Sequence, residues 1–140
     1  MNEVVNDQRH EAGEKSEPNI GPQRLINACG YSLAGLASAW RTEGAFRQEL
    51  IAAVILIPIA CLAPVAMVER VLLIGSVLLV MVVELVNCSI EAAVDRISLE
   101  RHDLSKRAKD TGSAAVLLSL VIGAMVWVLI LGPHLLRIAA

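Results

Sequence analysis

The stretch ELVNCSIEAAVD, from Glu84 to Asp95, places three carboxylates and an amide in an otherwise apolar part of the chain. It completes a run that begins at Val71 and is long enough, as a helix, to cross the hydrocarbon core of a membrane. With 3.6 residues per turn, the side chains of Glu84, Asn87, Glu91 and Asp95 lie within about 80° of one another. The stretch therefore predicts a membrane helix with one polar face.

Such a polar face needs a reason, because a charged side chain at the centre of a membrane costs about 2.5–3.5 kcal/mol on insertion scales. One reading is that Glu84 and Glu91 pair with other helices and hold an oligomer together. The other is a polar site open to the cytoplasm, with Glu84 about 10 Å deeper in the membrane than Glu91. Asp95, beside Arg96 at the helix end, could simply be solvated.

Two further stretches, residues 50–68 and 111–136, contain no Asp, Glu, Lys or Arg. Each is long enough for a span of the hydrocarbon core, which takes about 20 helical residues. The composition agrees, since 56% of the 140 residues are hydrophobic and 19% are charged, against about 45–50% and about 25% in soluble domains. The predicted fold class is an all-α membrane protein with three transmembrane helices. The length excludes soluble kinase folds of roughly 200 residues or more, and a net charge of −2 offers no basic field for nucleic acid.

The remaining segments of the chain complete the expected organisation. Leu25, Cys29, Leu36 and Trp40 recur at helical spacing and give one apolar stripe, which fits a helix lying in the membrane interface or packed on the bundle. We expect a disordered cytoplasmic tail at 1–22, an amphipathic surface helix at 23–47, transmembrane helices at 48–68, 70–95 and 112–133, and a cytoplasmic connection at 96–111.

The basic residues predict the orientation. All of the 12 Lys and Arg residues except Arg70 and Arg137 lie before the first span or between the second and third. Short cytoplasmic flanks carry the excess of positive charge. We therefore expect the N-terminus on the cytoplasmic side of a bacterial inner membrane, and the C-terminus on the periplasmic side.

Further polar residues are expected at the same interface. Glu43 and Glu49 flank the start of the first span, and Lys109 and Asp110 precede the third. Carboxylates at an interface suit Mg²⁺, a lysine suits phosphate, and a deeper carboxylate such as Glu84 could act as a general base. The sequence contains no GxxxxGK[ST] phosphate-binding loop. This combination suggests transfer of a phosphoryl group to a molecule in the membrane.

These residues resemble the prokaryotic integral-membrane diacylglycerol kinases from about Arg24 to Leu131. The family signature has the form E-x-[LIVM]-N-[ST]-[SA]-[LIV]-E-x-x-[apolar]-D, and Cys88 departs from it where Ser or Thr is usual. Further matches are GYSLAGL (30–36), AFRQE (45–49), VDRIS (94–98), LSKRAKD (104–110) and GSAAV (112–116). The resemblance implies a homotrimer with shared active sites, which phosphorylates diacylglycerol to phosphatidate with ATP as co-substrate.

The resemblance also implies a role for each matching residue. Glu84 would be the catalytic base, Glu43 and Glu91 would hold the divalent metal, and Asn87 and Asp95 would support them. ATP would be contacted by Arg24, Tyr31, Glu43, Glu91, Glu100, Arg101, His102, Lys109 and Asp110. The lipid substrate would be contacted by Gly30, Trp40, Ala45, Phe46, Arg47, Gln48, Glu49, Glu84 and Ser113.

Three alternatives stay open at this point. Some similar proteins prefer undecaprenol to diacylglycerol. A small non-enzymatic transporter could couple Glu84 to protons, but it leaves Glu43 and Lys109 unexplained. A purely structural subunit could use Glu84 and Glu91 for helix association.

Overall fold

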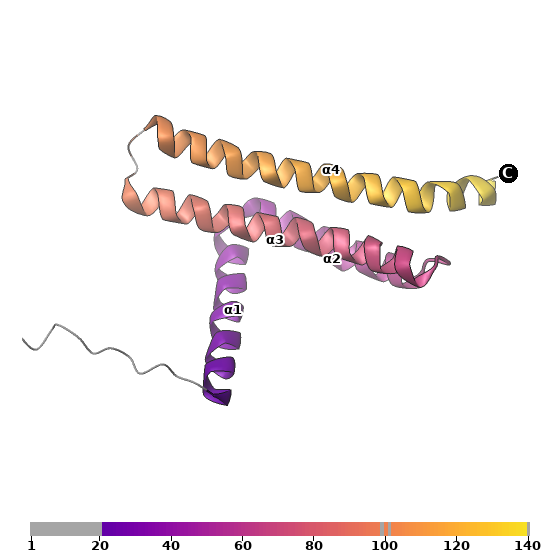
Figure 1. The fold of residues 1–140 in the computed structure, drawn as a ribbon, viewed down its shortest axis with the longest axis horizontal. Helices are drawn as coiled ribbons and strands as arrows, with labels where there is room; N and C mark the ends of the chain where they lie inside the picture. The colour runs from indigo at the N-terminus through magenta and orange to yellow at the C-terminus, as the bar shows by residue number, and fades with distance from the viewer. Residues whose placement is uncertain (1–20, 99, 101, 140) are drawn as a thin grey trace, which may run out of the picture. The chain divides into compact units, whose positions relative to one another are not determined.

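The chain forms four helices in a computed structural model that describes residues 21–98, 100 and 102–139 (Figure 1). Nearly all of the predicted tail lies outside these residues. A backbone in lipid must satisfy its own hydrogen bonds, and a helix does so locally. The helices are α1 (Pro22–Thr42), α2 (Gly44–Leu62), α3 (Met67–Ile97) and α4 (Asp103–Ala139).

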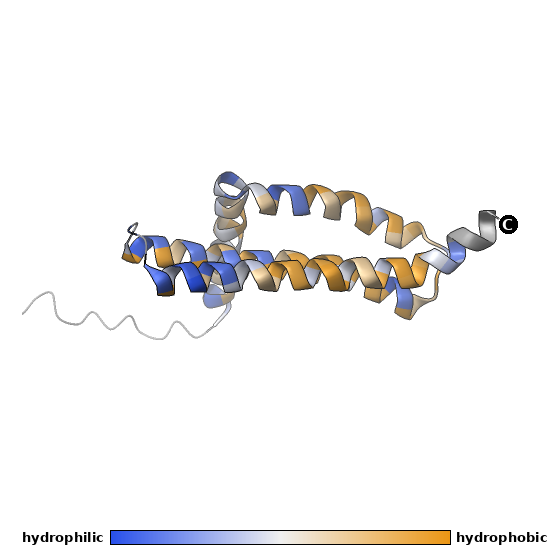
Figure 2. Ribbon diagram, turned by 90° about the horizontal axis from the view of Figure 1, so that it is seen from above, coloured by the Kyte–Doolittle hydropathy of each residue, from blue (hydrophilic) through white to orange (hydrophobic). Residues whose placement is uncertain are grey.

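The chain divides into two compact units, residues 1–36 and 37–140. In the first unit, residues 22–36 of α1 are helical and mostly exposed. The second unit contains the end of α1 and the helices α2, α3 and α4. Each of these three helices is long and apolar enough to cross a membrane, which confirms the expected all-helical class with three such helices. Their apolar residues run along the helices, and the hydrophilic ones gather toward the loop between α3 and α4 (Figure 2).

Helix α3 packs against both α2 and α4. Its buried apolar side chains are Leu73, Val77 and Val80, at the spacing of one helical face. Helix α2 meets α3 with Phe46, Ala53 and Ala60, which are spaced seven residues apart and are at most 2% exposed.

The face of α4 toward α3 is made of small residues. Gly112, Ser119 and Gly123 are buried along it, and small residues let two membrane helices approach closely. Trp127 adds a polar contact between the two helices, because its indole Nε1–H donates to the Leu73 carbonyl at 3.3 Å. The remaining surface of α4 is apolar and exposed, with Leu117, Leu118, Val121 and Val128 among its residues.

The helix ends differ from the expected segment boundaries at two places. A single helix was expected over 23–47, but the backbone is extended at Glu43, where α1 ends and α2 begins. The Arg47 guanidinium donates to the carbonyls of Trp40 and Arg41 at 3.2 and 3.3 Å, and so satisfies the end of α1. Much of the expected connection at 96–111 is helical, since α4 begins at Asp103.

The turn between α2 and α3 follows Pro58 and contains Pro64. The Glu69 carboxylate accepts a hydrogen bond from the Ala66 amide at 2.8 Å, and Arg70 donates to the Ala63 carbonyl at 3.1 Å. These contacts satisfy backbone groups that the two helix ends leave without partners.

Candidate active site

A buried carboxylate lies at the centre of the polar face of α3. The side chain of Glu84 is 3% exposed, and it lies in a helix that is long and apolar enough to cross a membrane. The one hydrogen bond that its side chain makes among the described residues comes from the Cys88 thiol, with Sγ 3.8 Å from Oε1. A thiol is a weak donor. The carboxylate is therefore shielded from water and only weakly held, which leaves its oxygens able to accept a proton.

Three more carboxylates lie within electrostatic range of Glu84. Glu43 and Glu91 lie close enough to interact with it electrostatically, and so does Glu49 from the neighbouring helix α2. Oε2 of Glu49 is buried and has no hydrogen-bond partner among the described residues. Like charges gathered in a poorly solvated place repel one another. We call Glu43, Glu49, Glu84 and Glu91 the acidic cluster. Their combined negative charge favours a cation nearby, although no three of them converge on one metal position among the described residues.

One member of the acidic cluster is oriented by a neighbour on its own helix. Asn87 Nδ2 donates to Oε1 of Glu91 at 3.2 Å. This bond and the contact of Cys88 with Glu84 both run within α3, between residues four apart. Within the described part of the chain, these two hydrogen bonds therefore orient side chains along a single face of α3.

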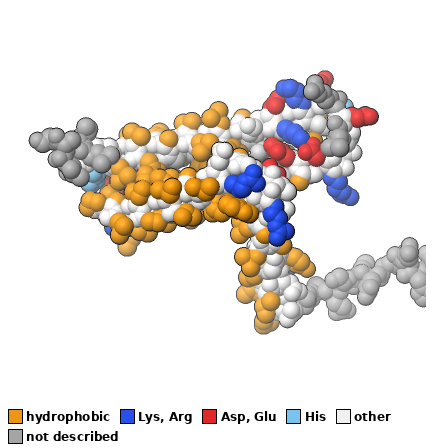
Figure 3. Space-filling model, turned by 180° about the vertical axis from the view of Figure 1, so that it is seen from behind, with side chains coloured by type: hydrophobic (Ala, Val, Ile, Leu, Met, Phe, Trp, Pro, Cys, Tyr) orange, Lys and Arg blue, Asp and Glu red, His pale blue; other side chains and the backbone are white. Residues whose placement is uncertain are grey.

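A polar pocket of about 570 Å³ lies at the loop between α3 and α4. Lys109 Nζ is 2.6 Å from Asp95 Oδ1 and so links the two helices, while Lys106 pairs with Asp110 at 2.6 Å. Acidic and basic side chains gather at this end of the helices (Figure 3). The pocket is lined by Val94, Asp95, Ser98, Glu100, His102, Asp103, Ser105, Lys106, Lys109 and Asp110.

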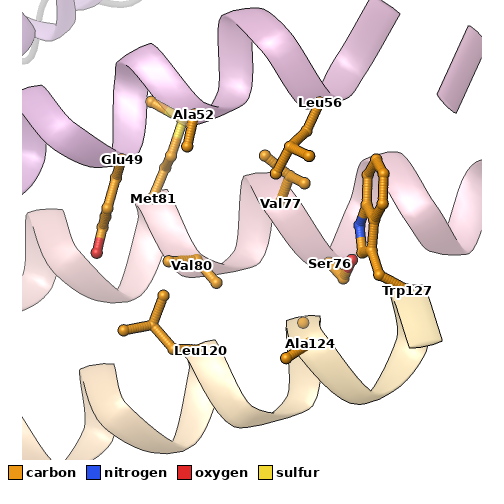
Figure 4. A pocket seen from close by; sticks show the side chains of 11 residues that line it. Glu49, Ala52, Leu56, Ser76, Val77, Val80, Met81, Leu120, Ala124 and Trp127 are labelled. Atoms are coloured by element: carbon orange, nitrogen blue, oxygen red, sulfur yellow. The ribbon is translucent and has the colours of Figure 1, made fainter. Parts of the chain in front are cut away.

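An apolar groove of about 330 Å³ lies between α2, α3 and α4. Glu49 lies at one end of it and Trp127 at the other, with Leu56, Val77 and Met81 among the side chains between them (Figure 4). Among the described residues that line the groove, Glu49 is the one that carries a charge. The groove therefore leads from the acidic cluster into a largely apolar space of the kind that a hydrocarbon chain fills.

The structure places the predicted site residues in three groups. Glu43, Glu84 and Glu91 come together in the acidic cluster, with Asn87 beside them. Asp95, Glu100, His102, Lys109 and Asp110 line the polar pocket. Glu49 is shared between the acidic cluster and the apolar groove.

The remaining predicted residues lie elsewhere. Phe46 is 1% exposed and packs in the bundle, Arg47 holds the end of α1, and Ala45, Gln48 and Ser113 are exposed. Trp40, at the end of α1, is 44% exposed. Arg24, Gly30 and Tyr31 are on the part of α1 in the first unit, and Arg101 lies outside the described residues.

Sequence reasoning missed two residues near these sites. Trp127 closes the apolar groove, and Gly112 touches the Asn87 side chain. A tryptophan within a membrane span needs a hydrogen-bond partner for its N–H. The sequence position of Trp127 could therefore have indicated such a contact. Gly112 begins the GSAAV stretch quoted above, but its contact with Asn87 depends on how α4 is aligned with α3.

The chain is similar in sequence to known bacterial proteins over most of its length. A family model described as prokaryotic diacylglycerol kinase matches residues 30–131. A protein of Pseudomonas aeruginosa named diacylglycerol kinase is 53% identical over 111 residues, which are 79% of this chain and 90% of that protein. The diacylglycerol kinase of Escherichia coli K12 is 52% identical over 114 residues, 81% of this chain and 93% of its own. A diacylglycerol kinase of Helicobacter pylori is 45% identical over 107 residues, 76% of this chain and 84% of its own.

Proposed function

The chain belongs to the prokaryotic diacylglycerol kinase family, and from this premise we propose that it phosphorylates diacylglycerol to phosphatidate with ATP. The reaction takes place at the cytoplasmic face of the bacterial inner membrane. The observation that carries the proposal is the buried Glu84 carboxylate, which lies in a membrane-length helix beside three other carboxylates. A lipid hydroxyl can reach a base at this depth, and water reaches it poorly.

In this mechanism Glu84 is the general base. Its carboxylate takes the proton of the lipid hydroxyl while the hydroxyl oxygen forms a bond to the γ-phosphorus of ATP. The bond between that phosphorus and the β,γ-bridging oxygen breaks, and ADP leaves. Phosphoryl transfer depends mainly on positioning and charge neutralisation, so the other residues serve to hold the two substrates and balance their charge.

The donor set also fits a magnesium ion. Mg²⁺ is usually held by one or two carboxylates together with substrate phosphates and water. Glu43 and Glu91 supply two carboxylates of the acidic cluster, and no group of three His, Cys, Asp or Glu side chains converges in the described residues. When bound there, the metal would supply positive charge that neutralises the phosphoryl group being transferred. Asn87 orients Glu91, and Thr42 donates a hydrogen bond to Glu43 at 3.1 Å.

The polar pocket is the proposed site for the nucleotide. Lys109 offers a positive charge to the phosphates, and Glu100, His102 and Asp110 offer hydrogen-bonding groups to the rest of the molecule. Glu91 and Asp95 are one helical turn apart on α3, so the pocket and the acidic cluster meet along that helix. Arg24, Tyr31 and Arg101 complete this proposed set.

The apolar groove is the proposed site for an acyl chain of the lipid. Glu49, at its polar end, would face the glycerol of diacylglycerol, and the chain would extend toward Trp127. Gly30, Trp40, residues 45–48 and Ser113 are the other proposed lipid contacts. The amphipathic α1 would lie in the membrane interface and bring part of this set to the lipid.

The proposed assembly is a homotrimer with active sites shared between subunits. Three helices leave much apolar surface uncovered, and α4 exposes large side chains along most of its length. A neighbouring copy would cover part of this surface and enclose the acidic cluster. Residues of two chains would then act on one pair of substrates.

Transfer of labelled phosphate to lipid tests the activity. We expect purified protein to pass the γ-phosphate of ATP to diacylglycerol in mixed micelles, and to do so faster than to undecaprenol at equal lipid fraction. Faster labelling of undecaprenol would assign the chain to that lipid instead. Lipid-independent binding or flux with no labelled product would support the transporter alternative.

Reporter fusions test the proposed topology. Residues 96–111 carry Arg96, Arg101, Lys106, Arg107 and Lys109 and are placed on the cytoplasmic side. A reporter that is active only in the cytoplasm should therefore be active when inserted in this segment and inactive when fused after residue 140. The opposite pattern would overturn the orientation while leaving the three spans in place.

A further inference from the structure

Helix α4 approaches the polar face of α3 closely at Gly112, which is buried. A methyl group added to this glycine would overlap Oδ1 of Asn87 and would come within 3.4 Å of its Cγ. The backbone of α4 therefore lies against the Asn87 amide. The absence of a side chain at residue 112 is what leaves room for that amide.

The direction of the Asn87 amide is fixed by its other neighbour. Asn87 is 8% exposed, and its Nδ2 donates to Oε1 of Glu91 at 3.2 Å. An ionised carboxylate only accepts hydrogen bonds, so the amide nitrogen must face Glu91. Oδ1 then faces Gly112, and it is buried with no hydrogen-bond partner among the described residues. Packing against α4 is the contact that confines this half of the amide.

We propose that Gly112 is a positioning residue for the metal ligand Glu91 and acts through Asn87. A side chain at residue 112 would push Oδ1 away and turn the amide out of line. Glu91 would then lose the donor that fixes one of its two oxygens. This inference rests on the proposed function, in which Glu91 holds Mg²⁺.

The test measures metal binding directly. Mn²⁺ occupies oxygen sites of the kind that hold Mg²⁺, and its binding to the purified full-length protein can be followed by EPR with a non-hydrolysable ATP analogue present. Loss of a hydrogen bond to a ligand commonly costs about 10–100-fold in metal affinity. We expect Gly112→Ala to weaken Mn²⁺ binding by about 10-fold. In turnover, the Mg²⁺ requirement should rise while the KM for diacylglycerol stays unchanged.

Gly123 supplies the matched control. It is a buried glycine on the same helix and in the same contact with α3, but a methyl group there would meet only Val80 Cγ2, at an ordinary distance of 3.7 Å. Gly123→Ala should bind Mn²⁺ as the parent protein does. Equal weakening in Gly112→Ala and Gly123→Ala would show a general effect of spreading the two helices, and would overturn the proposal.

A double variant tests the route through Asn87. Asn87→Ala removes the oxygen that a side chain at residue 112 would displace, so Gly112→Ala should add nothing to the loss that Asn87→Ala causes alone. Additive losses would contradict the proposal. If Gly112→Ala alone does not fold, comparing Asn87→Ala with the double variant still tests whether residue 112 acts through Asn87. Neither of these variants contains the steric overlap between a methyl group at residue 112 and Asn87 Oδ1.

Glu91→Gln separates this inference from its premise. If Glu91→Gln binds Mn²⁺ normally, Glu91 is not a metal ligand and the proposed function fails at that residue. If Glu91→Gln weakens Mn²⁺ binding but Gly112→Ala does not, the metal site stands and the role of Gly112 is wrong.

Discussion

Replacing Glu84 by Gln should lower kcat by about 10²–10⁴-fold, the usual contribution of a general base. The substitution keeps the size and most of the hydrogen bonding of the side chain but removes its ability to take a proton from the lipid hydroxyl. The KM values for ATP and diacylglycerol should change little, because neither substrate depends on Glu84 for its charge balance. Single-turnover measurement of phosphatidate formation would show the loss directly in the chemical step.

Folding must be intact for this result to be informative. Glu84 is 3% exposed and accepts one weak hydrogen bond, so a neutral amide should be tolerated at least as well as the carboxylate in a membrane. Glu69→Gln is the control, because Glu69 is on the same helix, and its side chain accepts a backbone hydrogen bond that an amide oxygen can also accept. Near-parental turnover of Glu84→Gln would remove Glu84 as the base.

Much of the bundle could be predicted from where charge is absent. Residues 50–68 and 111–136 contain no charged side chain, and lipid makes such gaps a strong signal for spanning helices. The polar face of α3 was equally readable, because helical periodicity alone brings Glu84, Asn87 and Glu91 to one side. Each of these features follows from the sequence of a single helix and does not depend on which other helices it contacts.

The helix ends and the contacts between helices were less readable. Residues 103–110 were expected in a connection because they are charged, yet the Lys106–Asp110 pair is one helical turn apart and compatible with α4. At the break at Glu43, Arg47 reaches back to the carbonyls of α1, a contact that no local sequence pattern indicates. The contact of Gly112 with Asn87 requires the register of α4 on α3, which local sequence patterns do not specify.

The second large effect on activity is expected from replacing Lys109, which lines the polar pocket. Lys109→Gln should lower kcat/KM for ATP by about 10²–10³-fold, which is the scale for removing one group that stabilises charge on reacting atoms. Arg107→Gln is the matched control, since Arg107 is an exposed cation on the same helix and is not among the residues that line the polar pocket. It should remain close to the parental activity. Initial rates at varied ATP and saturating diacylglycerol measure both.

The ion pair of Lys109 with Asp95 offers a rival explanation, in which the lysine only ties α4 to α3. Their side chains are 37% and 47% exposed, and pairs exposed to this degree add little to stability. Asp95→Asn breaks the pair and leaves the lysine charge in place, so it should cost far less than Lys109→Gln. Equal losses in the two variants would show that the pair itself is what matters. A loss confined to Lys109→Gln would place the lysine charge on the phosphates of ATP.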